Sequence, residues 1–182
     1  MLINRRYTQN AVASVKKQSA IFRYNRAVPF DRELIEAKLA LDLIASADMP
    51  SIAWDAWEAG VDGGPATMRL GALERPTYFE VSEVLPRVMQ ELGLSQVSRD
   101  KAALRMARRI AKEILESGDD PLKHLRDFES LWIRAGYPHE ISGLGTLYDD
   151  AWIAQSTGQS DAEIRESIVS MLRSFVQPLD TA

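Results

Sequence analysis

The chain has 182 residues, 46% of them hydrophobic, which is typical of one folded domain that buries a substantial core. It contains no cysteine, which excludes disulfides, thiol nucleophiles and cysteine-ligated metal centres. With 22 Lys and Arg against 26 Asp and Glu, the chain is mildly acidic, which argues against a surface devoted throughout to nucleic acid.

The charge is distributed unevenly along the chain. Residues 1–30 carry six basic and no acidic residues, whereas residues 31–94 carry 12 acidic and 5 basic residues. We expect residues 1–30 to form a helix that docks on the acidic region, with burial of Val15, Ile21 and Phe22 supplying most of the energy. The alternatives are a free arm for an anionic partner and an Arg-rich targeting presequence.

The first helix of the main domain, residues 31–182, is predicted to begin after Asp31. Its apolar residues occupy two opposite sides, with Leu34, Ala37, Leu41, Ile44 and Ala45 on one and Ile35, Leu39 and Leu43 on the other. A helix that is apolar on nearly every side belongs in the centre of a fold. Lys38 and Asp42 stand four residues apart and are expected to pair with each other.

Three further helices are predicted before residue 94. Residues 48–60 and 66–73 form two short ones, and the first carries Trp54 and Trp57 as expected core residues. The third begins with the capping box formed by Thr77 and Glu80 and continues to about residue 92. Pro86 lies inside this helix and is expected to kink or divide it.

The strongest helical pattern extends from Ser98, a plausible N-cap, to Gly118, a plausible C-terminal glycine. One side is apolar and is predicted to face the core. The opposite side is a basic ridge that consists of Lys101, Arg105, Arg108, Arg109 and Lys112. Because like charges repel at this spacing, we expect the fold to bring acidic residues to the ridge. The candidates are Glu140, Asp149 and Asp150.

Another helix is predicted to begin at residues 120–121 and to end at Gly136. His124 lies on or beside its apolar stripe, and Asp127 follows one turn later. A histidine oriented by an aspartate can act as a general base. More often, a histidine at the boundary of a core has a structural role, with its hydrogen bonds satisfied by neighbouring residues.

The remaining sequence predicts a short helix over residues 148–154 and a final helix opened by the capping box of Ser160 and Glu163. Seven or eight helices result, with no convincing strand, so we predict an all-α, single-domain helical bundle. Leu41, Trp57, Ile110 and Trp132 are expected to be largely buried in it.

Residues 50–178 show a loose resemblance to a family of small, uncharacterised bacterial all-helical proteins. The resemblance rests on residues 57–62 (WEAGVD), 70–73 (LGAL) and 91–94 (ELGL), and on the Ala- and Arg-rich helix that closes at Gly118 before Asp120 and Pro121. It implies a helical cytosolic protein of an accessory or immunity-like kind. No activity follows from it, and residues 1–30 lie outside it.

The sequence contains no recognisable catalytic motif and no metal or cofactor motif. We therefore expect a non-enzymatic module that binds a protein partner through the basic ridge, with nucleic acid as a partner only through the basic segments. The alternative is a small hydrolase that uses Asp or Glu with His124, for which Asp127 is the nearest acid. No apolar run approaches the roughly 18 residues of a membrane span, and no secretory signal is evident, so we expect a cytoplasmic protein without a membrane partner.

Overall fold

The computed structural model describes residues 30–177, which fold into α-helices and short 3₁₀ turns without any strand. Eight α-helices in this range have seven residues or more, which confirms the predicted all-α bundle. These eight helices and the four-residue α8 are α2 (Arg32–Ala40), α3 (Pro50–Glu58), α4 (Pro65–Gly71), α5 (Tyr78–Leu92), α6 (Arg99–Ser117), α7 (Leu125–Arg134), α8 (Ser142–Gly145), α9 (Leu147–Ser156) and α10 (Asp161–Val176). The predicted docking of residues 1–30 falls almost wholly outside the described residues.

Local signals in the sequence set most helix ends. Thr77 and Ser160 each form the predicted capping box, in which the hydroxyl accepts from a backbone N–H and the N3 glutamate accepts in return. Ser98 caps α6, and Gly118 ends it with a φ of 70°, a conformation that glycine adopts without steric cost. Pro86 does not divide α5, which is one helix from Tyr78 to Leu92.

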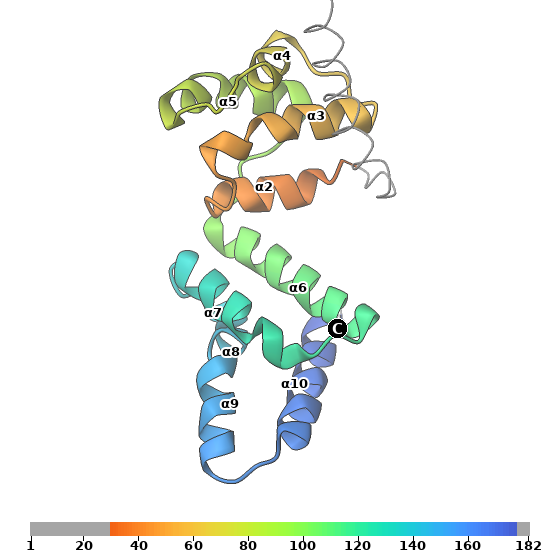
Figure 1. Ribbon diagram of the computed structural model, residues 1–182, viewed down its shortest axis with the longest axis vertical. Helices are drawn as coiled ribbons and strands as arrows, with labels where there is room; N and C mark the ends of the chain where they lie inside the picture. The colour runs from red at the N-terminus through yellow and green to blue at the C-terminus, as the bar shows by residue number, and fades with distance from the viewer. Residues whose placement is uncertain (1–29, 178–182) are drawn as a thin grey trace, which may run out of the picture.

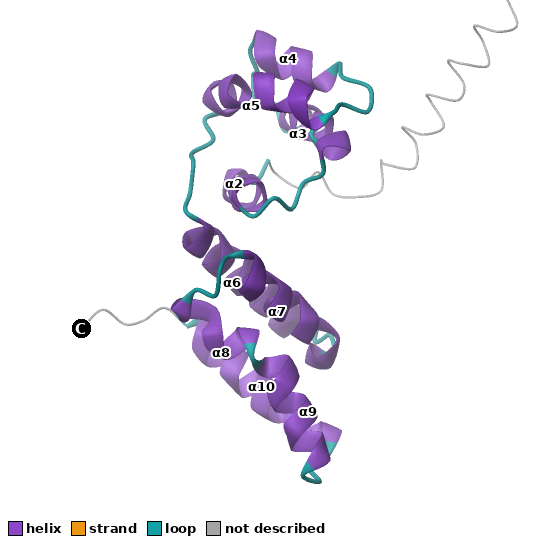
Figure 2. Cartoon of the chain, turned by 90° about the vertical axis from the view of Figure 1, so that its left-hand side faces the viewer, coloured by secondary structure: helices purple, strands orange, loops and turns teal. Residues whose placement is uncertain are grey.

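Helix α2 lies between two hydrophobic cores. Figures 1 and 2 show α3, α4 and α5 on one side of α2 and α6 with the later helices on the other. Ala37 of α2 and Leu41, the C-cap residue of α2, are fully buried in the core around α6, α7, α9 and α10, here called the α6 core. Ile35 and Leu39 pack against the core of α3, α4 and α5, here called the α5 core. The predicted central position of this helix is confirmed, and α2 joins the two cores into one domain.

Helix α2 is shorter than the sequence suggested. It ends at Ala40, and Asp42 just beyond it has a φ of 53°, which is outside the right-handed helical region. Asp42 therefore does not face Lys38 one turn back, and its carboxylate instead accepts from Arg99 Nη2 at 2.6 Å. The predicted Lys38–Asp42 pair is wrong because the helix stops before it can form.

The predicted core residues are buried to different degrees. Leu41 is fully buried as expected, whereas Trp57, Ile110 and Trp132 are only partly buried. The buried face of α3 consists of Ile52, Ala53 and Ala56. Trp54 lies outside this face and is 54% exposed. Periodicity identifies the buried side of a helix, but it does not show how far a wide side chain reaches past the edge of that side.

Candidate functional site

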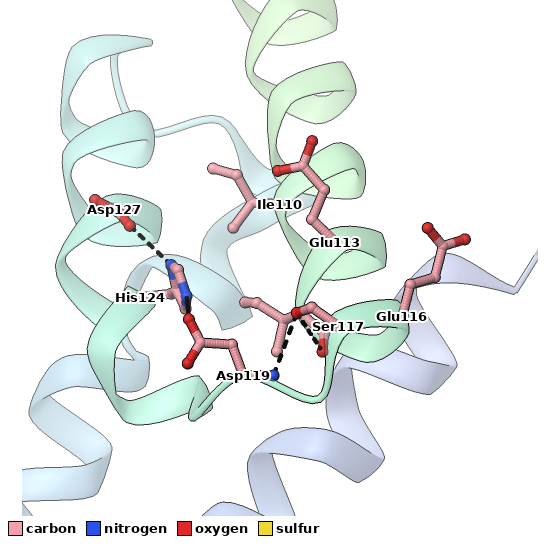
Figure 3. Close-up of a pocket in the computed structure, with 8 residues that line it drawn as sticks. Ile110, Glu113, Glu116, Ser117, Asp119, His124 and Asp127 are labelled. Carbon is pink, nitrogen blue, oxygen red and sulfur yellow. Dashed lines mark hydrogen bonds and ion pairs between the residues drawn. The ribbon is translucent and has the colours of Figure 1, made fainter. Parts of the chain in front are cut away.

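A cavity of about 710 Å³ lies between the C-terminal half of α6 and the start of α7. Ile110 and Ile114 of α6 line its apolar part, and Ile114 is only 3% exposed. The 3₁₀ turn Pro121–His124 carries His124 to the opposite wall (Figure 3). His124, the histidine that the sequence singled out, thus faces a cavity large enough for a small ligand or a peptide side chain.

His124 lies between two aspartates, as Figure 3 shows. Its Nδ1 lies 3.2 Å from Oδ2 of Asp127, which is the predicted partner, and its Nε2 lies 3.2 Å from Oδ2 of Asp119. Both ring nitrogens therefore face carboxylate oxygens, and a ring protonated on both nitrogens donates to both. The sequence suggested Asp127 through its one-turn spacing, whereas Asp119, in the turn after α6, was missed.

Asp119 is the acidic residue of the cavity whose pKa is clearly lowered. The Lys123 ammonium donates to its Oδ1 at 2.9 Å, and the backbone N–H of Asp120 and the His124 ring also lie within hydrogen-bond distance of its carboxylate. These three groups, with Lys123 first, lower the pKa of Asp119 from 3.8 to about 2. Asp119 therefore stays ionised at every pH at which the protein is expected to work.

This pKa predicts an acid-dependent contribution to stability. Because the pKa of Asp119 falls from 3.8 to about 2 on folding, its carboxylate stabilises the fold above about pH 4, and the contribution is lost as the pH falls to 2. Urea unfolding of the wild type and of Asp119→Asn, measured from pH 5 to pH 2, should show two midpoints that differ at pH 5 and converge near pH 2. A difference between the midpoints that stays constant over this range would contradict the prediction.

The cavity does not pair Ser117 with His124. Ser117 lies on the wall, but its Oγ donates to the Ile114 carbonyl at 3.5 Å and accepts from the Asp119 N–H at 3.2 Å. A serine nucleophile needs an imidazole nitrogen to take its proton, and within residues 30–177 both nitrogens of His124 already face carboxylates. The geometry thus matches a satisfied boundary histidine better than a general base.

The basic ridge predicted on α6 divides into an inner and an outer part. Arg105 donates to Glu36 of α2 at 2.8 Å, and Arg109 pairs with Asp31 at the start of α2 and with Glu113 at 2.9 Å. Burial alone would raise the pKa of Asp31, but the Leu34 N–H and the Arg109 guanidinium outweigh it and lower that pKa below its ordinary value. These two arginines hold α2 against α6.

The fold therefore does bring acidic residues to the ridge, but not the predicted ones. Glu140, Asp149 and Asp150 form no ion pair with the ridge, and the acids that meet its inner arginines are Glu36 of α2 and Asp31, the N-cap of α2. Glu36 and Asp31 lie 69 and 78 residues before their arginine partners. Helical spacing carries no information about partners so far apart in the sequence.

Three ridge residues remain on the outer side of α6, and we call them the outer strip: Lys101, Arg108 and Lys112. All three are exposed. Lys112 approaches Glu116 of its own helix at 3.6 Å, while Lys101 and Arg108 have no carboxylate of residues 30–177 within 4.0 Å. The outer strip is the part of the predicted partner-binding set that is available to another molecule.

Within residues 30–177, no group of three or more His, Asp or Glu side chains is placed to hold a metal ion. None of the helices in this range combines the length and the apolar character that crossing a bilayer requires.

Comparison with protein-family models, with curated proteins and with solved structures gives no match to this chain. The loose resemblance of residues 50–178 to small helical bacterial proteins therefore stays a prediction.

Proposed function

We propose that this chain is a non-enzymatic helical module that binds another protein. The observation that carries the proposal is an exposed aromatic pair at the start of α5. Tyr78 and Phe79 are 72% and 80% exposed, and their rings meet edge to face with centroids 5.9 Å apart. Aromatic side chains dominate the energetics of protein interfaces, and leaving two of them in water has no benefit for the isolated fold.

Helix α4 packs against α5 and carries a further exposed apolar side chain. The Arg69 guanidinium of α4 donates to the Glu83 carboxylate of α5 at 3.1 Å, so this part of α4 lies against the first two turns of α5. Met68, the neighbour of Arg69, is 61% exposed. We call Met68, Tyr78 and Phe79 the α4–α5 apolar patch. Methionine and aromatic residues are enriched in the centres of protein interfaces, which supports the choice of a protein as the partner.

The outer strip of α6 supplies a second element, which is electrostatic. Lys101 and Arg108 are exposed cations outside the internal ion pairs of the described chain, and such groups accelerate encounter with an acidic partner more than they strengthen the complex. We therefore propose that the apolar patch provides most of the affinity and that the outer strip steers association. The alternative hydrolase has weaker support, because both nitrogens of His124 face carboxylates.

Affinity capture with matched variants tests this proposal. Tagged wild type, Tyr78→Ser with Phe79→Ser, and the control Gln90→Ser on an exposed site of the same helix are incubated with lysate of the native host. Quantitative mass spectrometry should find a partner that the wild type and the control retain and that the double variant loses severalfold. Equal recovery by all three proteins would contradict the proposal.

The outer strip is tested by the rate of binding to that partner. Lys101→Glu with Arg108→Glu should slow association severalfold at low salt and leave dissociation almost unchanged, because screened charges act mainly on the encounter. Surface plasmon resonance at two salt concentrations measures both rates. An unchanged association rate would remove the outer strip from the site.

A further inference from the structure

Along α6, the cavity lies next to the N-terminal end of α2. Three ion pairs align α2 antiparallel to α6: Asp42 with Arg99, Glu36 with Arg105, and Asp31 with Arg109. The series ends at Asp31, the N-cap of α2, whereas α6 continues for about two more turns to Ser117. On those two turns, Ile110, Glu113, Ile114 and Ser117 line the cavity. Helix α2 therefore covers the first part of α6 and leaves the last part to the cavity.

Asp31, at the start of α2, is joined to the rim of this cavity through Arg109, whereas Phe30 before it packs against the α5 core. Arg109, which pairs with Asp31, also donates to Glu113 at 2.9 Å, and Glu113 lies on the cavity wall. One arginine thus connects the beginning of the described chain to the rim. Residues 1–29 would extend about 43 Å even as a continuous helix, so reach does not limit their contact with a cavity that starts one side chain away.

The cavity and residues 1–29 are complementary in charge and in apolar content. Four carboxylates line the walls, those of Glu113, Glu116, Asp119 and Asp127. His124 is the one basic group among the lining residues, and the cations that pair with the first three carboxylates, Arg109, Lys112 and Lys123, lie just outside the lining. Residues 1–29 contain six Lys and Arg and no Asp or Glu. They also contain Val12, Val15, Ile21 and Phe22, which match the apolar surface of Ile110 and Ile114.

We propose that residues 1–29 dock in the cavity between α6 and α7 and continue the cover that α2 gives to α6. Apolar side chains of the segment lie on Ile110 and Ile114, and its Lys and Arg residues lie along the acidic rim. The carboxylates of Glu113 and Glu116 are 62% and 66% exposed, so they can exchange their contacts with Arg109 and Lys112 for new ones at little cost. This docking site differs from the acidic region 31–94 that the charge balance alone indicated.

The absence of cysteine in the natural chain allows a clean crosslinking test. Ser117→Cys places a thiol on the cavity wall, and Ser14→Cys or Ser19→Cys places one in the segment. The matched control is Ser82→Cys on an exposed site of α5, paired with the same segment cysteines. Each full-length double variant is treated at low concentration with a short bis-maleimide, and peptide mass spectrometry quantifies the intrachain product.

The cavity pairs should give severalfold more intrachain product than the control pairs. Lys16→Glu with Lys17→Glu should reduce that product severalfold while circular dichroism shows an unchanged helix content. Equal yields for cavity and control pairs would show a free arm, and a preference for Ser82→Cys would place the segment on the α5 side; both results overturn the proposal. A product of twice the chain mass would show that the segment of one copy enters the cavity of another, which also overturns it.

Discussion

Replacing Phe128 with alanine should lower the free energy of unfolding by about 3–5 kcal/mol, the range found when large buried aromatic residues are truncated. Phe128 lies on α7, is 1% exposed and is among the largest fully buried side chains of the described residues. Its removal leaves a void in the α6 core, which includes the fully buried residues Ala103, Ala107 and Ala111. Alanine side chains are too short to fill that void.

The matched control for Phe128 is on the same helix. Ile133 is 48% exposed, so Ile133→Ala should cost less than about 1 kcal/mol. Urea unfolding followed by circular dichroism measures both variants, and the difference between them separates core packing from helix propensity. Similar losses for the two variants would mean that α7 does not present Phe128 to the core.

Replacing Glu36 with alanine should lower the free energy of unfolding by about 2–4 kcal/mol, because charge-assisted and buried hydrogen bonds are costly to break on one side only. The side chain of Glu36 is 9% exposed. Its carboxylate accepts from the backbone N–H of Ser95 at 2.7 Å and from Arg105 Nη1 at 2.8 Å. Alanine leaves both donors without that acceptor, and one of them is a guanidinium in the interface of α2 with α6.

Two further variants separate the contributions at Glu36. Glu36→Gln keeps an oxygen for the Ser95 N–H but loses the charge that faces Arg105, so its effect should fall between that of the wild type and that of Glu36→Ala. Glu83, which pairs with Arg69 on the surface, is 63% exposed, and Glu83→Ala should cost less than about 1 kcal/mol. Thermal and urea unfolding compare the three variants. A loss in Glu36→Ala no greater than that in Glu83→Ala would contradict the central role of Glu36.

Much of the fold was predictable because helix ends are encoded locally. Ser98 and Gly118 bracket α6 through a side-chain cap and a positive φ, and the boxes at Thr77 and Ser160 open α5 and α10 as their four-residue patterns predict. The two apolar sides of α2 likewise predicted its position between cores. These signals lie within a few residues of the features they determine.

The candidate site was predictable only where its partners are close in the sequence. The contact of His124 with Asp127 spans one turn and was expected, whereas the contact with Asp119 depends on the turn after Gly118. Arg105 and Arg109 were assigned to an external partner, but they face Glu36 and Asp31. Which acid neutralises which base depends on how helices cross, and composition and periodicity do not contain that information.

The position of α2 also has an evolutionary consequence. Most helices of a small domain have an outward side on which mutations accumulate with little effect, but within α2 only Arg32 and Glu33 are exposed. A change at almost any other position of α2 alters one core, the other, or the ion pairs with α6. Helix α9 leaves Trp152 and Ile153 largely in solvent, so substitutions at these positions should disturb the fold far less. As the gene diverges, the sequence of α2 should therefore drift slowly, and that of α9 should drift faster.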